Sequence, residues 1–185
     1  MENQETRIIR RVLEGDTDSF RHIVDAYSER LFRLVVRIVD RPEDAADVVQ
    51  DAFVRAYSRL STFDGRSSLS TWLYTIAARQ AISHARSRLR RPDTVDERDL
   101  AAISDSCADS LLDSPDDPRL AALPDAIDRL SPDERTLITL HYLEEMSLRE
   151  VAVVLGITEG NAKVRLLRTR RKLYLLINSL TPQYE

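Results

Sequence analysis

Glycine and cysteine are scarce in this chain of 185 residues, and each scarcity excludes a class of protein. The four glycines are too widely spaced for a phosphate-binding loop of the G-x-G-x-x-G or G-x-x-x-x-G-K-S/T kind, which argues against a nucleotide-dependent enzyme. The single cysteine, Cys107, has no intramolecular disulfide partner, and the three histidines lack the spacing of zinc ligands. We therefore expect no metal and no other cofactor.

Long apolar runs and a leader sequence are also missing. No stretch of 18 apolar residues is present to span a membrane, and Met1 leads directly into a charged segment without the apolar core of a signal peptide. Hydrophobic residues make up 43% of the chain, which is too many for a disordered protein. The sequence predicts a folded cytoplasmic protein, long enough for one ordinary domain or two small ones.

The net charge of −4 is spread unevenly along the chain. Residues 1–92 hold sixteen arginines against thirteen acidic residues, whereas residues 93–117 hold nine acidic residues and one arginine. This acidic segment contains few periodic apolar residues, and it holds Pro115 and is bordered by Pro92 and Pro118, as is common in solvated linkers. It predicts a linker at 93–118 between a domain at 1–92 and a second domain at 119–185.

Apolar residues in the first half recur at steps of three and four, the spacing of one helix face. The first such stripe comprises Phe20, Val24, Tyr27, Leu31, Leu34 and Ile38. It predicts a helix capped by Asp16 and ended at Arg41-Pro42, since the residue before a proline avoids the helical region. A second stripe, Val49, Phe53, Ala56 and Leu60, predicts a helix from near Glu43.

The rest of the chain is also helical in pattern. A turn-rich segment around Asp64-Gly65 precedes a helix expected from about Thr71 to Arg91, and further helices are expected at 119–130, 132–145, 147–155 and 159–178. Ser131 and Ser147 each stand three residues before a glutamate, the capping-box arrangement, and Gly156 suits a helix end. With no strand signal, these patterns predict an all-α fold that ends in a helix-turn-helix.

The last helix carries a DNA-binding pattern. Ala162, Leu166, Thr169 and Leu173 form its core stripe and leave basic and amide side chains exposed near the helix start, where a groove-inserted helix meets base edges. These exposed candidates are Asn161, Lys163, Arg165 and Arg168, with Arg171 further along to contact phosphates. Six basic residues and no acid lie between Lys163 and Lys172. A solvated basic face is the alternative interpretation.

The first domain offers a second candidate DNA surface. Trp72, the only tryptophan, follows the turn-rich loop and suits stacking on the bases of an opened strand, although a core role explains it equally well. The arginines that follow, Arg79, Arg86, Arg88, Arg90 and Arg91, are suited to a phosphate backbone or form the solvated end of a helix.

A polar face is predicted on the helix from Glu43, off its apolar stripe. It comprises Asp44, Asp47, Gln50, Asp51 and Arg55. No histidine or apolar pocket accompanies these carboxylates, so we expect no acid–base catalysis and no enzyme activity. Ordinary solubility accounts for them as well as any binding role.

Taken together, the motifs resemble the extracytoplasmic-function (ECF) sigma factors of bacterial RNA polymerase over nearly the full length. Residues 42–57 are similar to sigma region 2.2, residues 63–77 to region 2.3, and residues 130–173 to region 4. The resemblance implies a four-helix region 2 domain and a helix-turn-helix region 4 domain joined by the acidic linker.

The resemblance also implies partners for each surface. The polar face of residues 44–55, with Asp47, Gln50 and Asp51 at its centre, would bind the β′ clamp helices of core RNA polymerase. The loop and helix bearing Phe63, Arg66, Ser70, Trp72, Arg79, Arg86 and Arg90 would hold the opened minus-10 element of promoter DNA. Region 4 would read the minus-35 element and meet the β flap. An anti-sigma factor is a further expected partner, and no small-molecule substrate is expected.

Two other functions stay open at this stage. An autonomous helix-turn-helix regulator would bind two half-sites as a dimer, and it would need a sensor or dimerisation domain, for which the first half has no signature. A purely helical adaptor would have no affinity for DNA.

Overall fold

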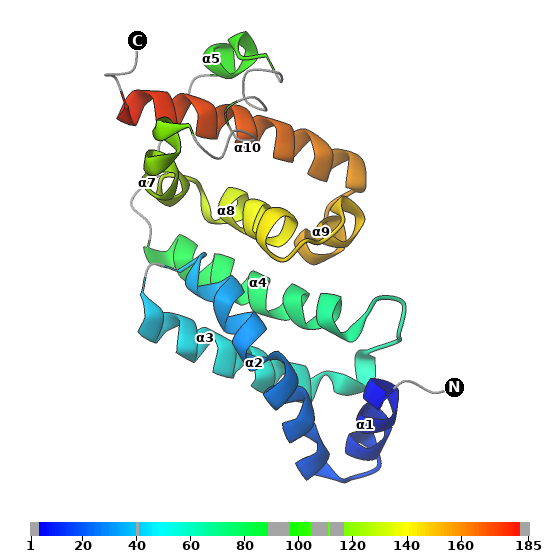
Figure 1. Ribbon diagram of the computed structural model, residues 1–185. Helices are drawn as coiled ribbons and strands as arrows, with labels where there is room; N and C mark the ends of the chain where they lie inside the picture. Colours follow the sequence, from blue (N-terminus) through cyan, green and yellow to red (C-terminus); the bar gives the residue numbers. More distant parts are fainter. Residues whose placement is uncertain (1–3, 40, 89–96, 105–110, 112–116, 182–185) are drawn as a thin grey trace. The chain divides into compact units, whose positions relative to one another are not determined.

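The structure of the chain is a computed structural model that describes residues 4–39, 41–88, 97–104, 111 and 117–181 (Figure 1). Within these residues every regular element is helical. They form two compact units, one built almost wholly from residues up to Arg88 and the other from later residues. The prediction of an all-α fold with two small helical domains is confirmed. The predicted domain boundary at residue 92 and Cys107 lie outside the described residues.

Two features are absent from the described part of the chain. None of its helices has the length and hydropathy needed to cross a membrane. Nor do its His, Cys, Asp and Glu side chains gather in any group of three or more placed to hold a metal ion.

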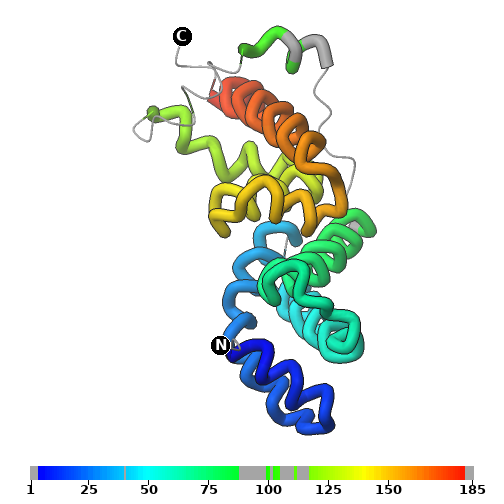
Figure 2. The backbone as a smooth tube through the Cα atoms, turned by 90° about the vertical axis from the view of Figure 1, so that its right-hand side faces the viewer, coloured from blue at the N-terminus to red at the C-terminus, as the bar shows by residue number. Residues whose placement is uncertain are grey.

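The first unit contains four α-helices and two short 3₁₀ turns. In chain order they are α1 (Gln4–Leu13), η1 (Thr17–Ser19), α2 (Phe20–Val36), α3 (Pro42–Ser58), η2 (Leu60–Thr62) and α4 (Leu69–Arg88). Helices α2, α3 and α4 each pack against the other two, and α1 lies beside α2 (Figure 2). Buried alanines on α3 and α4 bring these helices close together, among them Ala52, Ala56, Ala77 and Ala81.

The apolar stripes predicted for this unit are buried, with one exception. Val24 is only half-buried, while the other members of both stripes have at most 9% of their surface exposed. Asp16 acts as the expected cap, but of η1, where its carboxylate accepts from the Ser19 amide at 3.3 Å. Helix α2 ends at Val36, earlier than predicted, and Arg41 is extended before Pro42 at the first position of α3.

Helix α1 is fastened to α2 by a side-chain hydrogen bond. The Tyr27 hydroxyl donates to the Glu5 carboxylate. Burial, together with this carboxylate, raises the pKa of Tyr27 to about 12, so the hydroxyl keeps its proton at neutral pH.

The second unit is arranged around its longest helix. Its elements are α5 (Glu97–Ala102), η3 (Pro118–Ala122), α7 (Leu123–Asp128), α8 (Pro132–Ile138), the π-helical segment η4 (Thr139–Leu143), α9 (Leu148–Leu155) and α10 (Glu159–Leu180). Helix α10 contacts α5, η3, α7 and α8. Its predicted core stripe of Ala162, Leu166, Thr169 and Leu173 is buried.

The predicted caps in this unit are confirmed. Ser131 and Glu134 form a complete capping box at α8, and Ser147 and Glu150 exchange the same bonds at α9. Gly156 has φ of 67° in the turn between α9 and α10, where the Ile157 amide donates to the Ala152 carbonyl at 3.0 Å. Thr158 caps α10 by accepting from the Asn161 amide. A glycine is suited to this turn because other residues are strained at positive φ.

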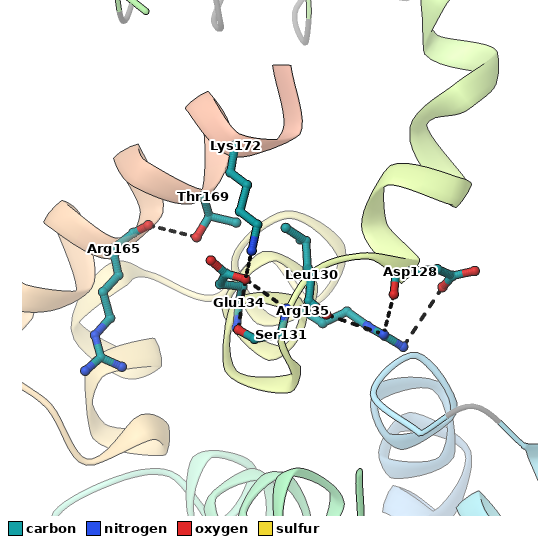
Figure 3. Close-up of polar contacts among 8 residues, drawn as sticks. All are labelled: Asp128, Leu130, Ser131, Glu134, Arg135, Arg165, Thr169 and Lys172. Carbon is teal, nitrogen blue, oxygen red and sulfur yellow. Dashed lines mark hydrogen bonds and ion pairs between the residues drawn. The ribbon is translucent and has the colours of Figure 1, made fainter. Parts of the chain in front are cut away.

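A partly buried ion pair joins α8 to α10 (Figure 3). The Lys172 ammonium lies 2.9 Å from a carboxylate oxygen of Glu134, the same oxygen that accepts from the Ser131 amide. Lys172, the last of the six basic residues counted from Lys163, is therefore not part of an exposed basic face: its side chain is 10% exposed and neutralises the partly buried Glu134 carboxylate. A second buried cation, Arg135, donates to the Asp128 carbonyl at 2.8 Å and stabilises the turn between α7 and α8.

The Glu134–Lys172 pair makes the stability of the second unit depend on pH. Burial raises the pKa of Glu134, but the Lys172 ammonium and the Ser131 donors outweigh burial, so the pKa of the folded state lies below the ordinary value of 4.5. The pair's contribution is complete above that ordinary pKa and is lost as the pH falls through the lowered one.

We expect Lys172→Met to lower the free energy of unfolding by about 1–3 kcal/mol at neutral pH, because the partly buried carboxylate loses its cation. This difference should shrink as the pH falls below 4.5. Urea unfolding followed by circular dichroism across this range measures both effects. Lys163→Met, at an exposed position of the same helix, is the control and should change stability by less than about 0.5 kcal/mol. Equal stability of Lys172→Met and the unchanged chain at neutral pH would contradict the assignment.

Candidate functional site

Helix α3 presents two different faces, because its successive side chains are rotated by about 100°. One face lies beside α2 and includes Gln50. The exposed Asp47 is about 60° from Gln50 around the helix axis and therefore borders this face. The opposite face lies beside α4 and includes Asp51 and Arg55. The five polar residues predicted to share one surface are therefore divided between two.

The face beside α2 forms an apolar groove of about 750 Å³. Its walls include Val24, Phe32, Val49, Phe53, Val54 and Tyr57, with Gln50 among them. Val54 is 62% exposed and Tyr57 43% exposed, which is unusual for apolar side chains that lie next to each other on one helix face. Ser28 and Glu29 of α2 also line the groove. A contiguous exposed apolar surface with a few polar groups in it is typical of a protein-binding site.

The opposite face forms a second groove, which we call the arginine groove, of about 510 Å³. Arg55, Arg59 and Arg79 line it together with a single carboxylate, Asp51. Hydroxyl groups of Thr75, Ser83 and Ser87 stand along the same walls. An excess of guanidinium groups beside neutral donors matches the chemistry of a phosphate chain.

The prediction that Asp44 is exposed is wrong. Its side chain is 11% exposed and lies 3.5 Å from Nε2 of His84 on α4 and 3.8 Å from Nε of Arg41. This position one turn into α3 faces the neighbouring helix, so Asp44 is placed to join α3 to α4.

The loop before α4 brings two aromatic rings together. The rings of Phe63 and Trp72 have centroids 5.5 Å apart and are tilted by 58°, and both side chains are half-buried. Trp72 is thus partly in the core and partly accessible, which agrees with both interpretations of it. Ser68 caps the helix by accepting from the Thr71 amide, and the half-buried Ser70 shares its hydroxyl network.

Two arginines of the predicted minus-10 surface, one in this loop and one on α4, are exposed. Arg66 lies 3.2 Å from the Asp64 carboxylate within the loop. Arg86 is exposed near the end of α4, and Arg90 lies outside the described residues.

Helix α10 exposes the predicted DNA-reading residues at its start. Asn161, Lys163, Arg165 and Arg168 are all exposed. Arg165 Nε donates to the Asn161 amide oxygen at 2.8 Å, which holds both side chains on one edge of the helix. Arg171 differs: it is half-buried and its Nη1 donates to the Leu100 carbonyl of α5 at 3.4 Å.

Comparison with known proteins assigns both units. Residues 23–91 match the sigma-70 region 2 family, and residues 120–173 match the sigma-70 region 4 family. The ECF RNA polymerase sigma factor SigW of Bacillus subtilis is 34% identical over 94% of this chain and 96% of its own. The chain belongs to the ECF sigma factors. It therefore acts in transcription initiation. The alternative function, an autonomous helix-turn-helix regulator, would not explain the match of residues 23–91 to sigma region 2.

Further relatives agree with this assignment. The RNA polymerase sigma-H factor of Pseudomonas aeruginosa is 33% identical over 91% of each chain. Among solved structures, CnrH in complex with the cytosolic domain of CnrY has a TM-score of 0.66 at 24% identity, covering 93% of this chain and 96% of that one. RpoE from Bartonella quintana, in complex with the anti-sigma factor NepR, has a TM-score of 0.59 at 22% identity, covering 90% of this chain and 98% of that one. These two likenesses show the fold.

Sequence reasoning missed the apolar groove and half of the arginine groove. Val54 and Tyr57 carry a signal, since they are apolar but lie off the buried stripe of α3. Arg59 and Ser83 follow Arg55 and Arg79 by one helical turn, but only the packing of α3 against α4 brings these two pairs to one groove.

Proposed function

We propose that this sigma factor uses three surfaces: the apolar groove for core RNA polymerase, the arginine groove with the Phe63–Trp72 loop for the minus-10 element, and the start of α10 for the minus-35 element. The observation that supports this division most directly is the separation of apolar and basic residues onto opposite faces of α3. A protein partner and a polyanion can then bind region 2 at the same time.

The apolar groove is suited to a helical partner such as the β′ clamp helices. Val54 and Tyr57 present apolar area one turn apart on α3, and Gln50 lies one turn before Val54 as a hydrogen-bonding group. Asp47, exposed at the groove edge, adds a charge at the rim, where it steers association. We therefore propose that Asp47 and Gln50 bind polymerase, whereas Asp51 and Arg55 belong to the arginine groove.

Val54→Glu should weaken binding to core polymerase by at least tenfold, because a carboxylate would be buried in an apolar contact. Leu13→Glu is the matched control: Leu13 is an equally exposed apolar residue of the same unit, 53% against 62%, but lies outside the groove. A competition assay for core enzyme, followed by promoter-specific transcription with the recovered holoenzyme, measures the effect. If both variants compete like the unchanged chain, the groove does not bind polymerase.

Strand holding at the minus-10 element is assigned to α4 and its preceding loop. Trp72 and Phe63 offer partly exposed ring faces to unstacked bases, and the arginine groove beside them offers guanidinium groups to phosphates. Arg66 and Arg86 are exposed at the two ends of this surface. Ser70 acts by holding the loop through the Ser68 hydroxyl.

Trp72→Ala should reduce open-complex formation on duplex promoters on the order of tenfold, and less on templates with a pre-opened bubble, because lost stacking matters most when the strands must be separated. Trp72→Phe keeps a ring beside Phe63 and should retain most of the activity. Permanganate footprinting on both templates gives the comparison. A purely structural role for Trp72 would instead cause equal losses on both templates.

Minus-35 recognition is assigned to the first turns of α10. A helix that enters the major groove by its N-terminus presents Asn161, Lys163 and Arg165 to base edges, and Arg168 follows at the phosphates. The Arg165–Asn161 hydrogen bond organises this edge before DNA binds. Contact with the β flap is proposed for region 4 as well.

Arg165→Ala should cost about 1–3 kcal/mol of promoter binding and change the preferred minus-35 sequence, since a bidentate base contact carries specificity. Transcription from a randomised minus-35 library reads out the preference. Arg129→Ala, an exposed arginine of the same unit outside α10, should leave it unchanged. An Arg165→Ala profile identical to that of the unchanged chain would refute base reading by this residue.

The same proposal covers partners and place of action. The chain works in the cytoplasm as a regulatory, non-catalytic subunit, and an anti-sigma factor holds it inactive by covering one of the three surfaces. The solved relatives CnrH, in complex with the cytosolic domain of CnrY, and RpoE, in complex with the anti-sigma factor NepR, support such a partner.

A further inference from the structure

Part of the segment between the two family matches is folded against α10. Helix α5 packs on α10, and the two lie side by side in both views (Figures 1 and 2). η3 packs on α10 too, where Arg119 Nη1 donates to the Asn178 amide oxygen at 3.3 Å. The expectation of a purely solvated linker therefore fails for α5, whereas η3 lies almost wholly in the domain predicted from residue 119.

The contact with α5 falls on a row of arginines. Arg165, Arg168 and Arg171 follow one another at steps of three, so they form a row that winds slowly around α10. The first two are exposed, whereas Arg171 is half-buried and donates to the Leu100 carbonyl. Helix α5 thus covers the third member of a row whose first two members are open to a ligand.

This cover lies on the side of α10 that faces away from the unit's core. At about 100° per residue, Arg171 is roughly opposite the buried stripe of Leu166, Thr169 and Leu173. Leu167 and Leu175, one turn before and after Arg171, are half-buried as well, although they lie off that stripe.

We propose that α5 is a displaceable cover of Arg171, docked on α10 in the free protein and released when promoter DNA binds. This inference rests on the proposed function of α10 as the minus-35 reader. While α5 is docked, the guanidinium of Arg171 donates to the Leu100 carbonyl and is withheld from DNA phosphates.

The contact between α5 and Arg171 is open to exchange. One of the contacts of Arg171 in the docked state is a long hydrogen bond, 3.4 Å, to the neutral carbonyl of Leu100. A phosphate oxygen is a charged acceptor, and such hydrogen bonds are roughly twice as strong. Helix α5 has six residues, too few to persist without its contact to α10, so local opening is cheap.

The test compares variants of the full chain in binding to a random-sequence DNA duplex, since phosphate contacts are independent of sequence. Leu100→Ser removes the half-buried side chain of α5, and Ala102→Ser, at an exposed position of the same helix, is the matched control. Fluorescence anisotropy at several salt concentrations should show roughly 3–10-fold tighter binding for Leu100→Ser and a salt slope steeper by about one. The control should bind like the unchanged chain.

Two further variants separate the possible failures. Adding Arg171→Ala to Leu100→Ser should abolish the gain, and a gain that persists without Arg171 overturns the proposal. Arg165→Ala should weaken binding in every background. If it does not, the DNA-binding role of α10 fails, whereas a normal loss with Arg165→Ala and no gain with Leu100→Ser overturns the cover alone.

Hydrogen exchange on the unchanged chain keeps the proposal testable if Leu100→Ser disturbs folding. Backbone amides of α5 should exchange faster when duplex DNA is bound, while those in the middle of α10 keep their protection. Unchanged or slower exchange in α5 on DNA binding overturns the proposal.

Discussion

Close packing of α3 between α2 and α4 is the constraint on which the surfaces of region 2 depend. Alanines at 52 and 56 of α3, and at 77 and 81 of α4, are buried, and larger side chains at these positions would push the helices apart. With α3 held in this way, its apolar and its charged residues are presented in opposite directions. The two grooves are consequences of one helix being fixed on both sides.

Region 4 relies on a different interaction, the partly buried Glu134–Lys172 pair. A capping box normally satisfies two backbone groups at a helix start, but here the Glu134 carboxylate also holds a lysine of α10. The start of α8 and the middle of α10 are thereby tied together, which sets how α10 lies on its core. Because Lys172 and the stripe beside it are buried, the basic residues at the start of α10 are left exposed.

Helix α5 of the linker affects how much positive charge the free protein exposes. DNA-binding proteins need basic residues for affinity, but exposed cations also bind nucleic acid without specificity. A linker helix that occupies Arg171 lowers this exposure without removing the residue. The same chain then has one basic surface when free and a larger one when bound to DNA.

The sequence by itself determined most of the helices, the caps of α8, α9 and α10 and the exposed residues at the start of α10, because these depend on local spacing and on hydrogen bonds within a few residues. The stripes at Leu31 and Leu166, the boxes at Ser131 and Ser147 and the turn at Gly156 are all of this kind. Periodicity shows which residues leave the core, but not what another helix places next to them. Only the tertiary structure decided that Asp44 is buried against α4, that Lys172 neutralises Glu134, that Gln50 and Asp51 face different grooves, and that α5 covers Arg171. Each of these depends on contacts between helices far apart in the chain.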